Sequence, residues 1–175
     1  MARVSTWYRI VRKTFKDGTP RTRSQDVLKS GGGRFHEDPV AAPTSYGAES
    51  LLTAWMEVTS RLGRARPNPR AWKAWVVSVR AGLWVDMRKA RTRKTYEISE
   101  ATLYADPWPP QCRELARRAR RGGAIGLIYR SVRNRPKGVC AAVFLENAKR
   151  RVRLRAVDPE DWNVFLAGLA PRGKS

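Results

Sequence analysis

The sequence predicts an α+β fold in which a mixed β core is flanked by short helices. Two nearly continuous apolar runs, Ile125–Tyr129 and Val139–Leu145, are typical of strands that are covered on both faces. Short alternating runs and short capped helices surround them along the chain. Of the 175 residues, 42% are hydrophobic, and the 7 tryptophans are spread from Trp7 to Trp162, so we expect one folded domain over residues 1–175.

The other predicted strands are short. Thr6–Arg12 begins the series with aromatic and branched residues at a period of two, and Ala74–Val79 and Leu83–Val85 follow the first helix. Arg151–Val157 alternates basic with apolar residues, which is typical of an edge strand. These segments alternate with helices, so the sequence predicts a mixed sheet rather than an all-β fold.

Three segments are predicted to be helices. Ser50–Leu62 carries apolar residues at helical spacing and is expected to end at Gly63. A second helix begins at the prolines 109–110 and carries an apolar stripe, and a third spans Asp158 to about Gly168, with an aspartate cap and a proline at its first position. Arg88–Lys94 is expected to be a charged connection without a packing role.

A glycine-rich segment precedes the first helix. Gly31–Gly33 leads into Arg34–His36, which together with Ser45–Tyr46 is predicted to form short strands. The run lacks the Lys-Ser/Thr of a P-loop and the spacing of a dinucleotide-binding turn. Glycines let a backbone approach a ligand closely, and an adjacent guanidinium can hold a diphosphate, but an ordinary surface loop has the same composition.

Composition and charge limit the possible functions. The 36 Lys and Arg residues against 15 Asp and Glu give a formal charge of +21, which attracts polyanions without identifying one. The 2 cysteines, Cys112 and Cys140, lie in apolar patterns and are expected to be buried and reduced. With no signal peptide or membrane span in the sequence, we expect a cytoplasmic protein. The single histidine, His36, is expected at the surface, and no Cys/His cluster has zinc spacing, so no metal site is expected.

Several short motifs follow one another in a specific order. They are Gly33-Arg34-Phe35, then Tyr46 and Glu57, then the octapeptide GLIYRSVR at residues 126–133, and finally the apolar segment 138–144. In this order the motifs resemble the RES domain, the toxin component of Res–Xre toxin–antitoxin systems. The resemblance covers about residues 32–145 and implies a fold similar to that of ADP-ribosyltransferase toxins.

The resemblance also implies which residues form the site. The arginine, glutamate and serine that characterise the family match Arg34, Glu57 and Ser131. Spacing from the tyrosine makes Glu57, rather than Glu49, the matching acid. The implied catalytic residues are Arg34, Tyr46, Glu57 and Ser131, and the implied substrate-binding residues are Gly33, Arg34, Tyr46, Ser131 and Arg133.

The activity implied by this resemblance is cleavage of the nicotinamide–ribose bond of NAD. NAD is then a substrate, no prosthetic group is expected, and the expected protein partner is an Xre-type antitoxin. The carboxylate of Glu57 would stabilise positive charge that develops on the ribose. Water, inorganic phosphate or a protein side chain can each accept the ADP-ribosyl group, so a glycohydrolase, a phosphorylase and an ADP-ribosyltransferase all stay open.

A nucleic-acid-binding module is the alternative from another class. It is suggested by the high positive charge and by Trp72, Trp75 and Trp84, which are interleaved with basic residues. A base-stacking platform requires these rings to be exposed, whereas their positions in strand-like apolar runs favour a core role. We therefore expect catalysis rather than nucleic-acid binding to be the main function.

Overall fold

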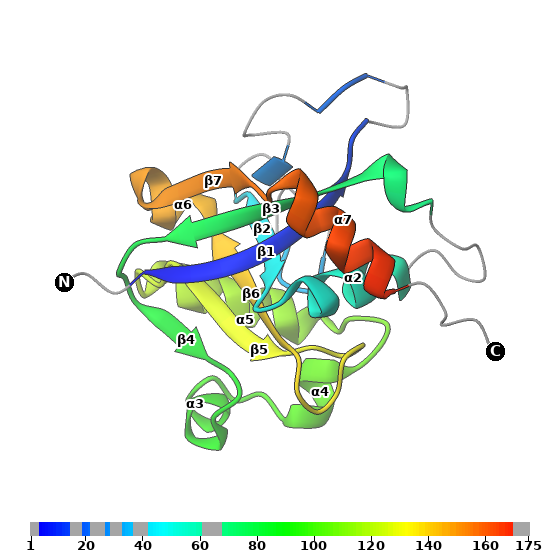
Figure 1. Ribbon diagram of the computed structural model, residues 1–175. Helices are drawn as coiled ribbons and strands as arrows, with labels where there is room; N and C mark the ends of the chain where they lie inside the picture. Colours follow the sequence, from blue (N-terminus) through cyan, green and yellow to red (C-terminus); the bar gives the residue numbers. More distant parts are fainter. Residues whose placement is uncertain are drawn as a thin grey trace.

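A computed structural model describes residues 4–14, 19–21, 27–28, 33–36, 42–60 and 68–169. In these ranges seven strands form one mixed sheet in the order β4-β5-β6-β2-β1-β3-β7 (Figure 1). Only the pair β4 and β5 is parallel. The strands are β1 (Ser5–Arg12), β2 (Thr44–Ala48), β3 (Trp72–Val79), β4 (Trp84–Asp86), β5 (Gly126–Arg130), β6 (Val139–Phe144) and β7 (Val152–Ala156).

Short helices flank this sheet, and the predicted α+β class is confirmed. Two 3₁₀ turns, η2 (Pro69–Ala71) and η3 (Lys149–Arg151), precede β3 and β7. The helices are α2 (Leu51–Thr59), α3 (Ala90–Thr95), α4 (Glu100–Tyr104), α5 (Pro110–Arg121), α6 (Leu145–Ala148) and α7 (Pro159–Gly168).

The two faces of the sheet belong to two separate hydrophobic clusters, and β6 contributes to both. Its residues Cys140, Ala142 and Phe144 face the larger cluster, to which α2, α4, α5 and α7 add their buried residues. Val139 and Val143 face the smaller cluster, which α6 helps to cover. All six residues of β6 are buried, and this double coverage explains why its sequence is continuously apolar.

Tryptophans join the elements on the larger side. The ring of Trp55 on α2 lies edge-on to those of Trp72 on β3 and Trp162 on α7, at centroid distances of 6.5 and 6.0 Å. Helix α7 accordingly crosses in front of β1 and β3, beside α2 (Figure 1). Trp72 is only 8% exposed, and Trp75 and Trp84 are half-buried. The three rings therefore do not form the exposed stacking platform that the nucleic-acid alternative requires.

The predicted helices occur at their expected places. Ser50 caps α2 by accepting from the Thr53 amide, and α2 ends at Thr59, earlier than predicted. In α5 the expected stripe of Cys112, Leu115, Ala116 and Ala119 is buried. In α7 the side chain of Asp158 caps the helix as expected. Leu62 and Gly63, with which the first helix was expected to end, lie outside the described residues, as do Gly31 and Gly32.

Three sequence predictions of local structure are wrong. Arg34–His36 forms a turn closed by the bond from the His36 amide to the Gly33 carbonyl (3.0 Å), and it belongs to none of the seven strands of the sheet. His36 is half-buried, and its ring nitrogens are shielded from solvent. Most of Arg88–Lys94 belongs to helix α3, although no residue of that helix is buried. The sequence analysis also missed α4, which Ser99 caps.

The remaining expectations concern cysteines, metals and membranes. Cys112 and Cys140 are buried and form no disulfide, as predicted. In the described ranges no three His, Cys, Asp or Glu side chains group in a way that could hold a metal ion. Within the same ranges no helix has the length and apolar character that crossing a bilayer requires.

Candidate active site

A pocket of about 280 Å³ opens on the side of the sheet that carries α2 and α4. This volume is near the lower end of the range for small-molecule sites, roughly 300–1,000 Å³. The pocket is lined by Arg34, Tyr46, Glu57, Asp106, Trp108, Tyr129, Val132 and Arg133. Segments that are far apart in the sequence thus bring Arg34, Tyr46, Glu57 and Arg133 together, while the other two predicted residues, Gly33 and Ser131, lie directly behind the wall.

Glu57 is held at the pocket by one of its carboxylate oxygens. Its helix α2 is anchored by the buried residues Thr53, Ala54 and Trp55, so that Glu57 follows on the next turn. Glu57 Oε1 accepts hydrogen bonds from the Ser131 hydroxyl (2.5 Å) and from the backbone amides of Val132 (3.1 Å) and Arg133 (3.4 Å). The hydrogen bonds of the described residues do not use Oε2, which leaves that oxygen for a bound molecule.

Ser131 orients Glu57 from beneath the pocket. Its side chain is fully buried, and the hydroxyl that donates to Glu57 also accepts from the amides of Arg133 (3.1 Å) and Asn134 (2.9 Å). A hydroxyl has one donor and two acceptor sites, so all three are occupied. The geometry therefore favours a role for Ser131 in orienting Glu57. It does not favour direct contact between Ser131 and a substrate. Because Ser131 is buried, the loop after β5 is less exposed than its polar sequence predicts.

Arg34 is a buried arginine that supports the opposite wall. It is 6% exposed, and its Nη1 donates to the carbonyl of Leu103 and to that of Ala105 (3.1 Å), at the end of α4. Its guanidinium also lies 5.9 Å from the ring centroid of Trp108. The hydrogen bonds of the described residues leave Nε and Nη2 unused, so Arg34 can hold the wall and still donate to an anion.

Gly33 and Tyr46 are matched in shape. The Tyr46 hydroxyl accepts from the Phe35 amide at 2.9 Å, which holds the tyrosine ring against the turn that carries Arg34. A Cβ atom on Gly33 would lie only 2.5 to 2.6 Å from ring atoms of Tyr46. Gly33 therefore allows the Tyr46 side chain to approach the backbone closely. From the sequence, close approach of a ligand was the function considered for these glycines.

Gly33→Ala is accordingly expected to displace the Tyr46 ring and to lower any activity of the pocket. Contacts this short do not occur in folded proteins, so either the ring or the turn must move. We expect a loss of about 1–3 kcal/mol in the free energy of unfolding, as for other overpacked sites, and at least a tenfold loss of turnover. Denaturant unfolding and steady-state kinetics measure the two effects. Gly168→Ala is the matched control, because no atom lies within 4 Å of the added Cβ; an equal loss in both variants would contradict the prediction.

The structure also adds pocket residues that the sequence analysis missed. Asp106 and Arg133 form an ion pair at the mouth, with 3.3 Å between Oδ2 and Nη2, and their side chains are 62% and 42% exposed. Trp108 follows Asp106 in the proline-rich loop, and Tyr129 and Val132 come from β5 and the loop after it. Tyr129, Val132 and Arg133 lie in the octapeptide motif at residues 126–133, and Arg133 was already expected in the site. No motif distinguishes Asp106 or Trp108, although a tryptophan between prolines 107 and 109 could have indicated a presented aromatic ring.

Two further groups near Glu57 are held in their neutral forms. Burial, together with the nearby charge of Glu57, raises the pKa of the Cys140 thiol far above its ordinary value. Burial likewise raises the pKa of Tyr129 well above that of a free tyrosine. A protonated thiol is a poor nucleophile, and Cys140 is buried and does not line the pocket.

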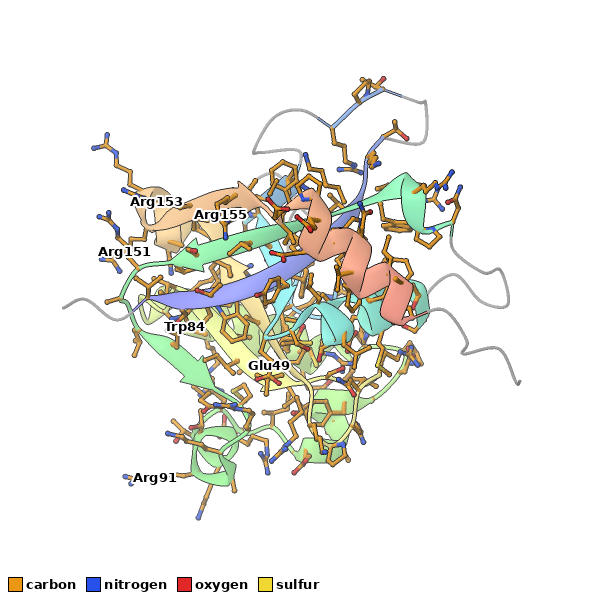
Figure 2. The ribbon with its side chains drawn as sticks, viewed as in Figure 1. Glu49, Trp84, Arg91, Arg151, Arg153 and Arg155 are labelled. Carbon is orange, nitrogen blue, oxygen red and sulfur yellow. The ribbon has the colours of Figure 1, made fainter. Side chains whose placement is uncertain are left out.

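Glu49, the other acid near the expected position, does not line the pocket. Its Oε1 accepts from the Val139 amide at 2.9 Å, so it connects the end of β2 to the start of β6. Figure 2 labels Glu49, which is exposed at this strand end. The geometry thus agrees with the choice of Glu57 as the acid of the site.

Comparison with known protein families places this geometry in context. The profile of the RES domain matches residues 6–167, which is nearly the whole chain. The chain belongs to the RES-domain family. The matched region includes every residue of the pocket, and it extends the resemblance from residues 32–145 to residues 6–167.

The fold of this RES domain has a counterpart among solved structures. A chain in the crystal structure of the M. tuberculosis MbcT-MbcA toxin-antitoxin complex superimposes with a TM-score of 0.66 and 18% sequence identity. The alignment covers 95% of the RES chain and 91% of the other chain. At this identity the likeness establishes a shared fold. Comparison with curated protein sequences gives no significant match.

Proposed function

We propose that this RES domain cleaves the nicotinamide–ribose bond of NAD. The observation that carries the proposal is Glu57, a carboxylate whose Oε1 is fixed by three donors while the residue itself lines a pocket with arginines and aromatic rings. Cleavage of this bond develops positive charge on the ribose. A carboxylate that is already fixed in place can stabilise that charge without any rearrangement of the protein in the transition state.

The bond between C1′ of the ribose and the nicotinamide nitrogen breaks heterolytically. The electron pair leaves with nicotinamide, which becomes neutral, and C1′ becomes oxocarbenium-like. Glu57 Oε2 accepts from a ribose hydroxyl and stabilises this charge. Water or inorganic phosphate then bonds to C1′ and loses a proton, and the product is ADP-ribose or its 1″-phosphate.

The other lining residues suit the remaining parts of the substrate. The unused donors of Arg34, together with Arg133, provide guanidinium groups for the diphosphate. Tyr46, Tyr129 and Trp108 provide aromatic walls for the nicotinamide ring. Since the pocket measures only about 280 Å³, we expect it to enclose the nicotinamide ribose while the adenosine half lies toward the mouth.

Arg133→Gln tests the binding of the diphosphate without risk to folding, because Arg133 lies at the mouth with its side chain 42% exposed. The variant is expected to raise the KM for NAD roughly tenfold with little change in kcat, since a hydrogen bond to a charged group contributes about 1.5–3 kcal/mol. Arg113→Gln, which changes an exposed arginine of α5, is the control. An unchanged KM in Arg133→Gln would remove Arg133 from the substrate site.

The direct assay incubates the purified protein with NAD and follows release of nicotinamide, with and without inorganic phosphate. ADP-ribose in both conditions indicates a glycohydrolase, and a phosphorylated product that requires phosphate indicates a phosphorylase. Label that passes from NAD to a protein indicates the alternative, an ADP-ribosyltransferase. Intact NAD under all conditions would refute the proposal.

We further propose that the protein acts as a toxin that is neutralised by an antitoxin protein, of the Xre type that the sequence analysis expects. This is supported by its membership of the RES family and by its fold likeness to a chain of a toxin-antitoxin complex. Expression of the wild-type chain in a bacterial host should lower cellular NAD and stop growth, and co-expression of its antitoxin should restore both. Growth arrest with undiminished NAD would separate toxicity from NAD cleavage.

A further inference from the structure

A strongly basic surface lies at one edge of the sheet, away from the pocket. Strand β7 pairs with β3 alone and forms that edge, and η3 leads into it. Residues 149–157 contain five basic residues and no acid. We define the basic edge as the exposed residues Arg80, Lys149, Arg150, Arg151, Arg153 and Arg155.

Acids of the described residues pair with arginines elsewhere on the protein, away from this surface. On α3, α5 and the nearby loops the acids are paired with arginines, as in Arg88–Asp86, Arg93–Glu100, Arg117–Glu114, Arg118–Glu97, Arg120–Glu146 and Arg133–Asp106. In the part of the chain that the structure describes, no residue of the basic edge has an acidic partner. Its positive charge is therefore not neutralised within that part.

The strand geometry orders these charges. Arg153 and Arg155 point to the same side of β7, opposite Ser78 and Val76 of β3, while Leu154 packs into the smaller cluster. Two residues along a strand span roughly 6.7 Å, which is similar to the rise of two nucleotides along one strand of a duplex, about 3.4 Å each. Figure 2 labels Arg153 and Arg155 on β7 and Arg151 at the end of η3, which leads into that strand.

We propose that the basic edge binds the phosphodiester backbone of nucleic acid independently of base sequence. Five of its six residues are arginines, whose planar guanidinium groups match phosphate oxygens. None of the six is aromatic or lines the pocket, so the surface neither stacks bases nor depends on NAD cleavage. A single charge is enough to stop an edge strand from pairing with another sheet. This edge carries several more charges than that protection needs.

An acidic protein is the other class of partner that positive charge could attract. Protein interfaces are enriched in arginine, but together with aromatic residues and methionine at an apolar core. The outward side chains of β7 are arginines alone, which fits a polyanionic backbone better than a protein surface. The test therefore includes an acidic peptide as the competing outcome.

The experiment compares two triple variants of the full chain with equal loss of charge. One is Arg151→Gln, Arg153→Gln, Arg155→Gln on the basic edge. The control is Lys89→Gln, Arg91→Gln, Lys94→Gln, three exposed residues at or in α3, which follows β4 at the opposite edge of the sheet (Figure 2 labels Arg91). Fluorescence anisotropy measures binding of a mixed-sequence DNA duplex, a single-stranded RNA and a glutamate-rich peptide of equal charge, between about 50 and 200 mM salt.

We expect the wild type to bind DNA or RNA with an affinity that falls steeply with salt. The basic-edge variant should lose at least about tenfold in affinity and reduce the magnitude of the log–log salt slope by about 3, one for each lost phosphate contact. The control should change much less, and both variants should unfold at the wild-type temperature. Binding of the DNA alone or of the RNA alone still supports the proposal and shows which nucleic acid the basic edge binds.

Three results would overturn the proposal. The first is no binding to either nucleic acid. The second is an equal loss in the two triple variants, which would mean that binding follows net charge and not the basic edge. The third is binding of the glutamate-rich peptide as tightly as the nucleic acids, which would indicate an acidic protein partner.

Discussion

Glu57→Gln is expected to lower the rate of nicotinamide release by roughly a hundredfold or more, a loss of about 3 kcal/mol in transition-state stabilisation. Glutamine has nearly the shape of glutamate, and its carbonyl oxygen can still accept from Ser131 and from the amides of Val132 and Arg133. The fold and the pocket should therefore persist while the negative charge is lost. Steady-state assays with NAD measure the rate, and denaturant unfolding checks the fold.

Glu49→Gln is the matched control for this experiment. Glu49 is an acid near Glu57 in sequence, but it binds the backbone of β6 and does not line the pocket. Its variant should keep nearly the wild-type rate. A Glu57→Gln protein that cleaves NAD at an undiminished rate, or equal losses in both variants, would remove the carboxylate of Glu57 from the mechanism.

Ser131→Ala should have the second largest effect, on both stability and turnover. The substitution removes the donor to Glu57 and leaves the Asn134 amide without its acceptor, while the Arg133 amide keeps only its longer bond to Glu57 Oε1. Unsatisfied buried donors cost about 1–3 kcal/mol, so the free energy of unfolding should fall by about that amount. The kcat should fall tenfold or more with little change in KM, because Ser131 positions Glu57 and does not contact the substrate.

Ser45→Ala provides the comparison. Ser45 is also buried, on the neighbouring strand β2, but its hydroxyl has no hydrogen-bond partner among the described residues. Removing it should be nearly neutral for unfolding and for kcat. If Ser131→Ala were as mild as Ser45→Ala, the loop after β5 would not be what holds Glu57 in place.

The arrangement explains how a small domain fixes the carboxylate of Glu57 at the pocket. Helix α2 brings Glu57 from one side of the sequence, and the loop after β5 brings its three donors from about 75 residues later. Asn134 connects the same loop back to α2, since its side chain donates to Thr53 Oγ1 at 2.8 Å. The loop is thus attached to the helix at two points one turn apart.

Local patterns in the sequence were sufficient for most of the secondary structure. The period of two predicted β1 and β7, the continuous apolar runs predicted β5 and β6, and the caps predicted the start of α7. Each of these signals comes from residues within a few positions of one another, whose spacing already decides which side chains share a face. The errors at Arg34–His36 and at α3 occur where no apolar period exists.

The site depended on information of a different kind. Motif order and family resemblance selected Arg34, Tyr46, Glu57 and Ser131, and helical or strand periodicity alone would have treated all four as ordinary residues. Only the tertiary structure showed that Ser131 lies beneath Glu57, that Arg34 supports the loop of Trp108, and that Asp106 closes the mouth. These relations join segments that are far apart in the sequence, and their geometry exists only once the sheet and α2 have packed together. The sequence by itself thus determined the elements and, through resemblance, the candidate site residues, whereas packing decided which of them line the pocket and which hold the others in place.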